Sequence, residues 1–448
     1  MVYLKERSRP QLMRRLLNLL DPHYFIAVLI IVIPLYPKFP LFQISGTFVS
    51  VRAEDFVLLV SLIVFSVSFL RKAGYLISNR VVFSMGLFLS VAALSVLSAV
   101  FVTQTVVPHI GLLHWLRRVE YFFPFVLALS IKHTKSHLKL YLACLVVVVN
   151  YAFVYGLAQK YFSLPIVTTQ NQEYSKGVAL RYTPGGHINS TFAGHYDLAS
   201  FLILVLPLFY TSFFVFRDRL SKLLLSVSVV TSLWLLVNSV SRISIVSYLV
   251  AVTLSLALIK KYKAILVAAL ISLLFIAFSS NLLSRYSRII EVTIDKISTN
   301  FVAVAASEES VPVSEDRSTS IRLNVEWPRA LRALTKNPLL GTGFSSITLA
   351  TDNDYLRLLG ETGAVGFISF IAVLLWLAVT VSMKLPVNKT LNFANMWVVG
   401  FAGSFTGILL NAMFIDIFES SKFATMFWLF AGIVVSICTS VNANEEAK

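Results

Sequence analysis

Four charged residues stand at the start of a hydrophobic run in the segment "TDNDYLRLLGETGAVGFISF", residues 351–370. They are Asp352, Asp354, Arg357 and Glu361. Ionisable groups at membrane depth are costly, so these side chains must face water, one another or a ligand. On a helix Asp354, Arg357 and Glu361 share one stripe, at i, i+3 and i+7, which favours a stabilising ladder of acid, base and acid. Asp352 precedes that helix as an exposed carboxylate, where spacing alone favours an N-cap over a catalytic role.

Arginines lie beside several other apolar segments, on the side that the charge distribution described below assigns to the outside. An arginine fork binds phosphate oxygens in bidentate fashion and is always charged. Any one of these arginines is expected to be structural, snorkelling to headgroups or pairing with an acid, as Arg118 could with Glu120. Convergence of several segments instead favours a pocket for a lipid-linked diphosphate, with Arg117 and Arg242 as first choices. The predicted diphosphate ligands are Arg117, Arg118, Arg181, Arg242, Arg322 and Arg357.

Three further side chains are lesser candidates. His187 and His195 flank "INSTFAG" in a long polar segment, and a lone histidine is more often structural than a base. Glu361 is the third. The acids Asp416 and Glu419 of "MFIDIFESSK" have no partner that the sequence identifies, and we interpret them as solvated. No cluster has metal-ligand spacing, so neither a metal nor another cofactor is expected.

The composition predicts that these residues sit on membrane helices. Of 448 residues, 57% are hydrophobic and 13% are charged, whereas soluble proteins carry roughly 25% charged residues. Apolar stretches near or above 18 residues recur twelve times, each close to the length of a spanning helix. We therefore expect an all-α polytopic membrane protein of about 12 transmembrane helices, with residues 1–448 forming one integral-membrane domain. The basic N-terminal segment is interpreted as preceding a retained first helix.

Basic residues predict the orientation. The segments "RKAGYLISNR", "KHTKSHLK", "FRDRLSK", "KKYK" and "KLPVNK" would all be cytoplasmic if both termini are inside, as the positive-inside bias requires. The net charge of +16 then reflects topology and not nucleic-acid binding. Two long segments, residues 163–195 and about 280–353, become outer loops, where binding residues tend to lie. Within the second, "SEESVPVSEDRSTS" is interpreted as a flexible insert.

The order of these motifs resembles the O-antigen ligase and O-antigen polymerase family of membrane glycosyltransferases. That family has His-Asn, nine residues and then Gly-x-x-Gly, and here Asp352-Asn353 is followed by nine residues and "GAVG". The helix start Ser241-Arg242 and the segment "HINSTFAGHYDLASFLILVLP" are also similar to the family's. The family's Arg…Trp…Pro-Leu-x-Gly-x-Gly stretch is matched by Arg322, Trp327, Pro338, Leu339, Gly341 and Gly343. The related core would span residues 215–375.

The resemblance implies a metal-independent, inverting glycosyltransferase of the bacterial cytoplasmic membrane. Its donor would be a glycan on undecaprenyl diphosphate at the outer leaflet, and its acceptor a hydroxyl of a glycan or lipid. Asp352 and Asn353 would form the catalytic pair, with Asp352 as the base and the arginines stabilising the leaving diphosphate. Because Asp352 stands where the ligases place histidine, a polymerase or a ligase to another acceptor is favoured.

Two other functions remain open. Twelve helices also describe the major facilitator transporters, but the loop "RKAGYLISNR" lacks the acid and second glycine of their usual pattern. A flippase for the same lipid-linked glycan would carry charges along the middle of many helices. Here the charges gather at one edge, which favours the enzyme.

Overall fold

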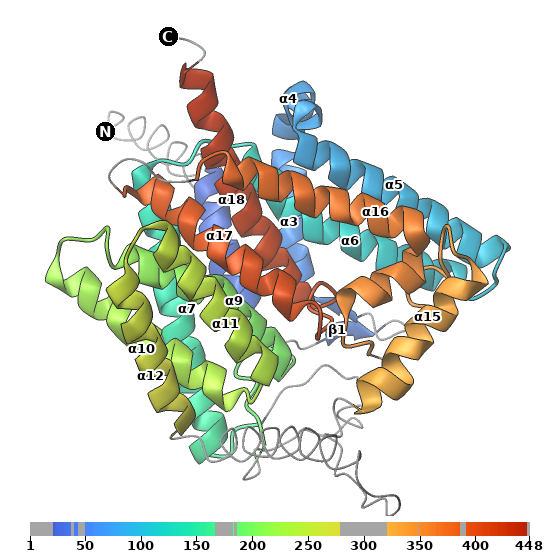
Figure 1. Ribbon diagram of the computed structural model, residues 1–448. Coiled ribbons are helices and arrows are strands. Elements are labelled where there is room, and N and C mark those ends of the chain that lie inside the picture. Colours follow the sequence, from blue (N-terminus) through green and yellow to red (C-terminus); the bar gives the residue numbers. More distant parts are fainter. Residues whose placement is uncertain are drawn as a thin grey trace, which may run out of the picture.

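The computed structural model describes residues 21–36, 40–43, 50–165, 182, 186–277, 320–348, 350–385 and 391–445. Most of these residues are helical (Figure 1). The two described strands, β1 (Pro40–Gln43) and β2 (Ser50–Arg52), form one antiparallel pair. The prediction of an all-α membrane protein is therefore confirmed, while Arg181 and the segment "SEESVPVSEDRSTS" lie outside the described residues.

The helices follow one another through short connections over most of the chain. In the first half they are α2 (Pro22–Leu35), α3 (Ala53–Arg71), α4 (Ala73–Ser78), α5 (Arg80–Phe101), α6 (Pro108–Leu129) and α7 (Lys135–Tyr161). In the second half they are α9 (His195–Ser212), α10 (Arg219–Asn238), α11 (Arg242–Leu258), α12 (Tyr262–Ala277), η1 (Arg322–Glu326), α15 (Trp327–Lys336), α16 (Asp354–Ser382), α17 (Phe393–Asn411) and α18 (Ser421–Glu445).

Among the described residues, seven helices are long and apolar enough to cross a membrane: α5, α7, α9, α10, α16, α17 and α18. Three shorter apolar helices are α2, α11 and α12. The predicted number of 12 spans is not confirmed. Helices α3 and α6 have 19 and 22 residues and carry three charged residues each, and they are not among these seven.

Close helix packing builds the centre of the bundle. Helix α17 packs on α9 and α11, and α18 packs on α6. A Cβ on Gly403 or Gly407 of α17 would overlap backbone carbonyls of α11, so glycine at these positions lets the two backbones approach. The buried face of α18 includes Trp428, whose ring meets Phe122 edge-on at 4.7 Å between centroids.

The bundle has two chemically different ends. At one end Lys72 donates to the carbonyl of Ser130, and Lys135 and Lys139 lie over the ring of Phe393. At the other end lie β1, β2, η1, α15 and the start of α16. Figure 1 shows α4 and the last turns of α18 on one side of the molecule, and β1 and α15 toward the opposite side. We call these the lysine-rich end and the strand end.

Candidate active site

The loop that carries Asp352 is held by Asp416, a residue between α17 and α18. The two Asp416 carboxylate oxygens accept the backbone N–H groups of Thr351, at 2.8 Å, and of Asn353, at 2.9 Å. Asp352 itself has a positive φ of 49°, which turns the chain sharply before α16. The interpretation of Asp416 as a solvated acid is therefore wrong: its side chain is 11% exposed and clamps the loop.

The expected N-cap at Asp352 is also wrong. The cap of α16 is Asn353, whose side-chain oxygen accepts the N–H of Leu356 at 3.0 Å. The turn at Asp352 directs its carboxylate elsewhere, to Arg322 at the start of η1. The Arg322 Nε and Nη2 atoms both donate to Asp352 Oδ2, at 3.0 and 2.7 Å. The carboxylate is 19% exposed, so it is largely buried in an ion pair and not fully exposed to solvent.

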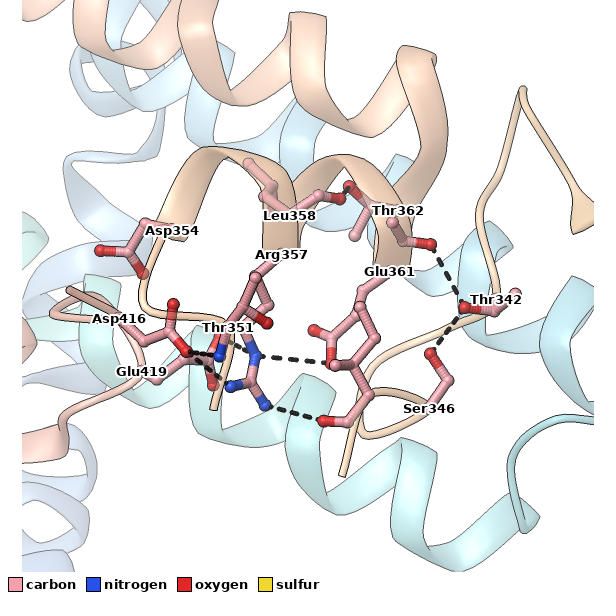
Figure 2. A network of polar contacts seen from close by, with 12 residues as sticks. Thr342, Ser346, Thr351, Asp354, Arg357, Leu358, Glu361, Thr362, Asp416 and Glu419 are labelled. Carbon is pink, nitrogen blue, oxygen red and sulfur yellow. Dashed lines mark hydrogen bonds and ion pairs between the residues drawn. The ribbon is translucent and has the colours of Figure 1, made fainter. Parts of the chain in front are cut away.

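Arg357 is the centre of a second group of charges (Figure 2). Its guanidinium donates to Asp416 at 3.0 Å and to the carbonyl of Ile347 at 3.1 Å. It also lies 3.6 Å from Glu361 and 3.8 Å from Glu419. The expected contact between Arg357 and Glu361 on one helix face is therefore confirmed. Asp416 and Glu419, on the connection between α17 and α18, also contact Arg357.

Asp354 departs from the expected ladder. Its carboxylate accepts the backbone N–H groups of Ile417, at 2.8 Å, and Phe418, at 3.1 Å. In return the Asp354 N–H donates to the carbonyl of Ala412 at 3.0 Å. This exchange of hydrogen bonds fixes the start of α16 against the connection between α17 and α18.

The neighbouring arginines of α6 point to different partners. Arg118 binds Glu419 and the carbonyl of Phe418, and it lies over the ring of Phe344. Arg117 pairs with Asp55 at 2.9 Å and with Glu120 at 3.4 Å. The suggested pair of Arg118 and Glu120 is thus wrong, because residues three apart share a helix face and residues two apart do not. The interpretation of Glu419 as solvated is likewise wrong.

Glycines lock the loop before Asp352 onto a break in α16. Gly363 has φ 67° and ψ −174°, which interrupts the helix, and Gly341 has φ 68°. A Cβ at Gly341 would overlap the carbonyl of Glu361, and one at Gly363 would overlap that of Leu339. The N–H of Gly343 donates to the Glu361 carbonyl at 2.7 Å. The Gly-x-Gly and Gly-x-x-Gly motifs therefore form a single packed unit.

A third set of candidates gathers beside the Arg322 and Asp352 pair. The Tyr196 hydroxyl lies within electrostatic range of Arg322, Asp352 and Arg242. The rings of His187 and His195 are 3.8 Å apart, and His195 contacts Tyr196 at 4.0 Å between centroids. The structure thus joins segments that the sequence suggested separately.

Electrostatics distinguish two carboxyls that lie outside the spanning helices. Burial raises the pKa of the Asp352 carboxyl above its ordinary value, although the positive charge of Arg322 opposes this shift. Burial, and then the negative charge of Asp352, raise the pKa of Glu326 to about 7. Sequence reasoning missed Glu326, although its position next to Trp327 of the family motif marks the right segment.

The arrangement places arginines, a carboxylate and an aromatic hydroxyl at the strand end of the bundle. These groups can bind an anion and accept a proton. In the described part of the chain, no three histidine, cysteine or acidic side chains lie close enough to hold a metal ion. Binding of a diphosphate by the six predicted arginines stays a prediction.

Comparison with known proteins agrees with these motifs. No curated protein matches the chain at a significant level. Residues 227–371 match the family model described as O-antigen ligase. The matched region includes Arg242, Arg322, Asp352 and Arg357, and it ends inside α16 beyond the break at Gly363. This region of the chain, residues 227–371, is therefore similar to the O-antigen ligase family of membrane proteins.

Proposed function

We propose that the chain is a glycosyltransferase that moves a glycan from an undecaprenyl-diphosphate carrier to an acceptor hydroxyl on the outer leaflet of the bacterial cytoplasmic membrane. The observation that carries this proposal is the ion pair of Arg322 and Asp352 beside Tyr196 and Arg242. It supplies a cationic fork for phosphate oxygens and a carboxylate for a proton within one group.

The orientation follows from the distribution of charge. The connections at the lysine-rich end carry Lys72, Lys132, Lys135, Arg217 and Lys261. Such residues favour the cytoplasmic side, so the strand end would face outward. Arg242 and Arg322 would then meet a lipid diphosphate at the depth of the outer headgroups.

The chemistry that we propose needs few groups. The acceptor oxygen attacks the anomeric carbon as the bond from that carbon to the phosphate oxygen breaks, and the electron pair leaves with the diphosphate. Arg242 and Arg322 stabilise the charge that develops on the diphosphate. Asp352 takes the acceptor proton, and Asn353 orients the loop through its cap of α16.

The other predicted arginines have a different place in this proposal. Arg117, Arg118 and Arg357 pair with carboxylates other than Asp352, and we propose that they contribute positive potential and rigidity to the site. Because Asp352 stands where the family's ligases place histidine, we favour a polymerase, or a ligase that uses a different acceptor.

The test is turnover in proteoliposomes that contain a glycan linked to undecaprenyl diphosphate. Release of the lipid diphosphate together with a ladder of glycan lengths is expected for a polymerase, and release with a single product length for a ligase. Arg242→Ala and Arg322→Ala are expected to lower this release. Movement of the lipid between leaflets with no release by the wild-type protein would contradict the proposal and indicate a flippase.

A further inference from the structure

Glu326 is the last residue of an unusual helical turn, η1, which begins at Arg322. In η1 the N–H of Trp327 donates to the carbonyl of Arg322, five residues earlier, as in a π-helix. Pro328 follows in the sequence, and because proline has no N–H it cannot donate to the carbonyl of Asn324 as an α-helix requires. Such wide turns occur frequently at functional sites. Here the turn keeps Glu326 within electrostatic range of Arg322 and Asp352.

Polar atoms around this turn lack partners. Within the described residues, Glu326 Oε2, Trp327 Nε1 and Arg329 Nη1 are buried and make no hydrogen bond. Buried polar groups in native proteins are nearly always satisfied. Three unsatisfied atoms within four consecutive residues therefore indicate polar groups that are completed by water or by a bound polar molecule.

The charges that face Glu326 come from several elements. Asp352 lies on the connection before α16, and Asp416 lies on the connection between α17 and α18. Arg322 lies in η1, and Arg329 lies in α15. Glu326 is half-buried, with a pKa of about 7. A carboxyl in this environment can take up a proton and release it again near neutral pH, whereas its neighbour Asp352 is held by a bidentate arginine contact.

Resting on the proposed function, we propose that Glu326 receives the proton that Asp352 takes from the acceptor hydroxyl. When the new bond from the acceptor oxygen to the anomeric carbon forms, the hydroxyl proton moves to the Asp352 carboxylate and neutralises the partner of Arg322. Transfer of that proton to the Glu326 carboxylate restores the ion pair, which favours the transfer. The half-exposed Glu326 then releases the proton to water. Glu326 acts through Asp352 and not on the sugar.

The experiment is the pH profile of kcat between pH 5 and 9 in proteoliposomes, for wild type, Glu326→Gln and Glu326→Asp. For the wild type we expect kcat to rise with pH through about 7, because Glu326 must be deprotonated to accept the proton. Glu326→Gln should not show this rise of kcat with pH (the acid limb of the profile), and its kcat at pH 8 should be about tenfold or more below the wild-type value. Glu326→Asp should retain the limb. Asp218→Asn, an exposed carboxylate at the lysine-rich end, is the matched control and should leave the profile unchanged.

The outcomes separate the relay from the proposed function. An active wild type with a Glu326→Gln variant of unchanged rate and profile would overturn the relay alone. If Glu326→Gln does not fold, a folded Glu326→Asp variant that lacks the limb near 7 would overturn it equally. A wild type that releases no lipid diphosphate at any pH would overturn the transferase and the relay with it.

Discussion

Asp416 fixes the position of Asp352 through the backbone on both sides of it. One Asp416 oxygen accepts the N–H of Thr351, the other accepts the N–H of Asn353, and the same carboxylate pairs with Arg357. A carboxylate between α17 and α18 thus ties the Asp352 loop to the charges of α16. The loop depends on a residue outside the matched family segment, which ends at residue 371.

Asp416→Asn should therefore damage both stability and activity. The amide keeps the size of the side chain but offers one acceptor oxygen in place of two, and it leaves Arg357 without one of its carboxylates. Removing one partner of a largely buried ion pair costs about 3 kcal/mol. We expect a lower melting temperature in detergent and a loss of turnover larger than the loss of folded protein. Asp218→Asn is again the control, because asparagine caps a helix as well as aspartate does. Equal melting temperatures for Asp416→Asn and wild type would contradict the clamp.

Gly363→Ala should destabilise the docked glycine unit. Alanine at φ 67° and ψ −174°, a region that essentially only glycine occupies, is strained by about 1 to 3 kcal/mol, and its Cβ would also overlap the carbonyl of Leu339. The measurement is the free energy of unfolding, or the melting temperature where unfolding is irreversible. Gly74→Ala in α4 is the matched control, since a Cβ there meets no other atom, and it should be neutral or slightly stabilising. An undiminished melting temperature for Gly363→Ala would show that the break in α16 is not needed.

Much of the fold is readable from the sequence because hydrophobic length and helix periodicity are local properties. The helices around Arg242 and Asp354 begin where the apolar runs begin, and the contact between Arg357 and Glu361 follows from their spacing. The partners of Arg118 and Asp352 do not follow, because they lie 301 and 30 residues away in the sequence. The contacts of Asp416 and Glu419 do not follow from the sequence for the same reason. Their connection has no periodicity, and only folding brings it to the start of α16.

Arg322→Lys should impair the site almost as strongly as Arg322→Ala. Lysine keeps the positive charge but cannot make the two contacts of the Arg322 fork to Asp352, and it binds a diphosphate as a point charge. We expect kcat/KM for the lipid-linked donor to fall by about 100-fold in both variants. Arg80→Ala is the control, because Arg80 stacks on Trp376 in α16 at the other end of the molecule. A Lys variant with wild-type kcat/KM would argue against bidentate binding.

The proposed orientation can be measured by cysteine labelling in intact cells. Both native cysteines, Cys144 and Cys438, are buried, so they give little background. Ser163→Cys lies on an exposed turn after α7, toward the strand end, and should react with a membrane-impermeant maleimide added outside. Arg217→Cys, between α9 and α10, is exposed at the lysine-rich end and should react only after the membrane is permeabilised. The reverse pattern would place the strand end in the cytoplasm and contradict the outer active site.

The most direct test of the central claim is the turnover of Asp352→Asn with a glycan on undecaprenyl diphosphate. The amide keeps the shape of the side chain and a hydrogen bond acceptor for Arg322, but it cannot take a proton. We predict a loss of about 100-fold or more in kcat with a folded protein and bound donor. In the wild type, kcat should decrease as the pH is lowered. This decrease should begin at a higher pH than for an ordinary aspartate, because burial raises the pKa of Asp352. A folded Asp352→Asn protein that releases lipid diphosphate at the wild-type rate would contradict the assignment of Asp352 as the base.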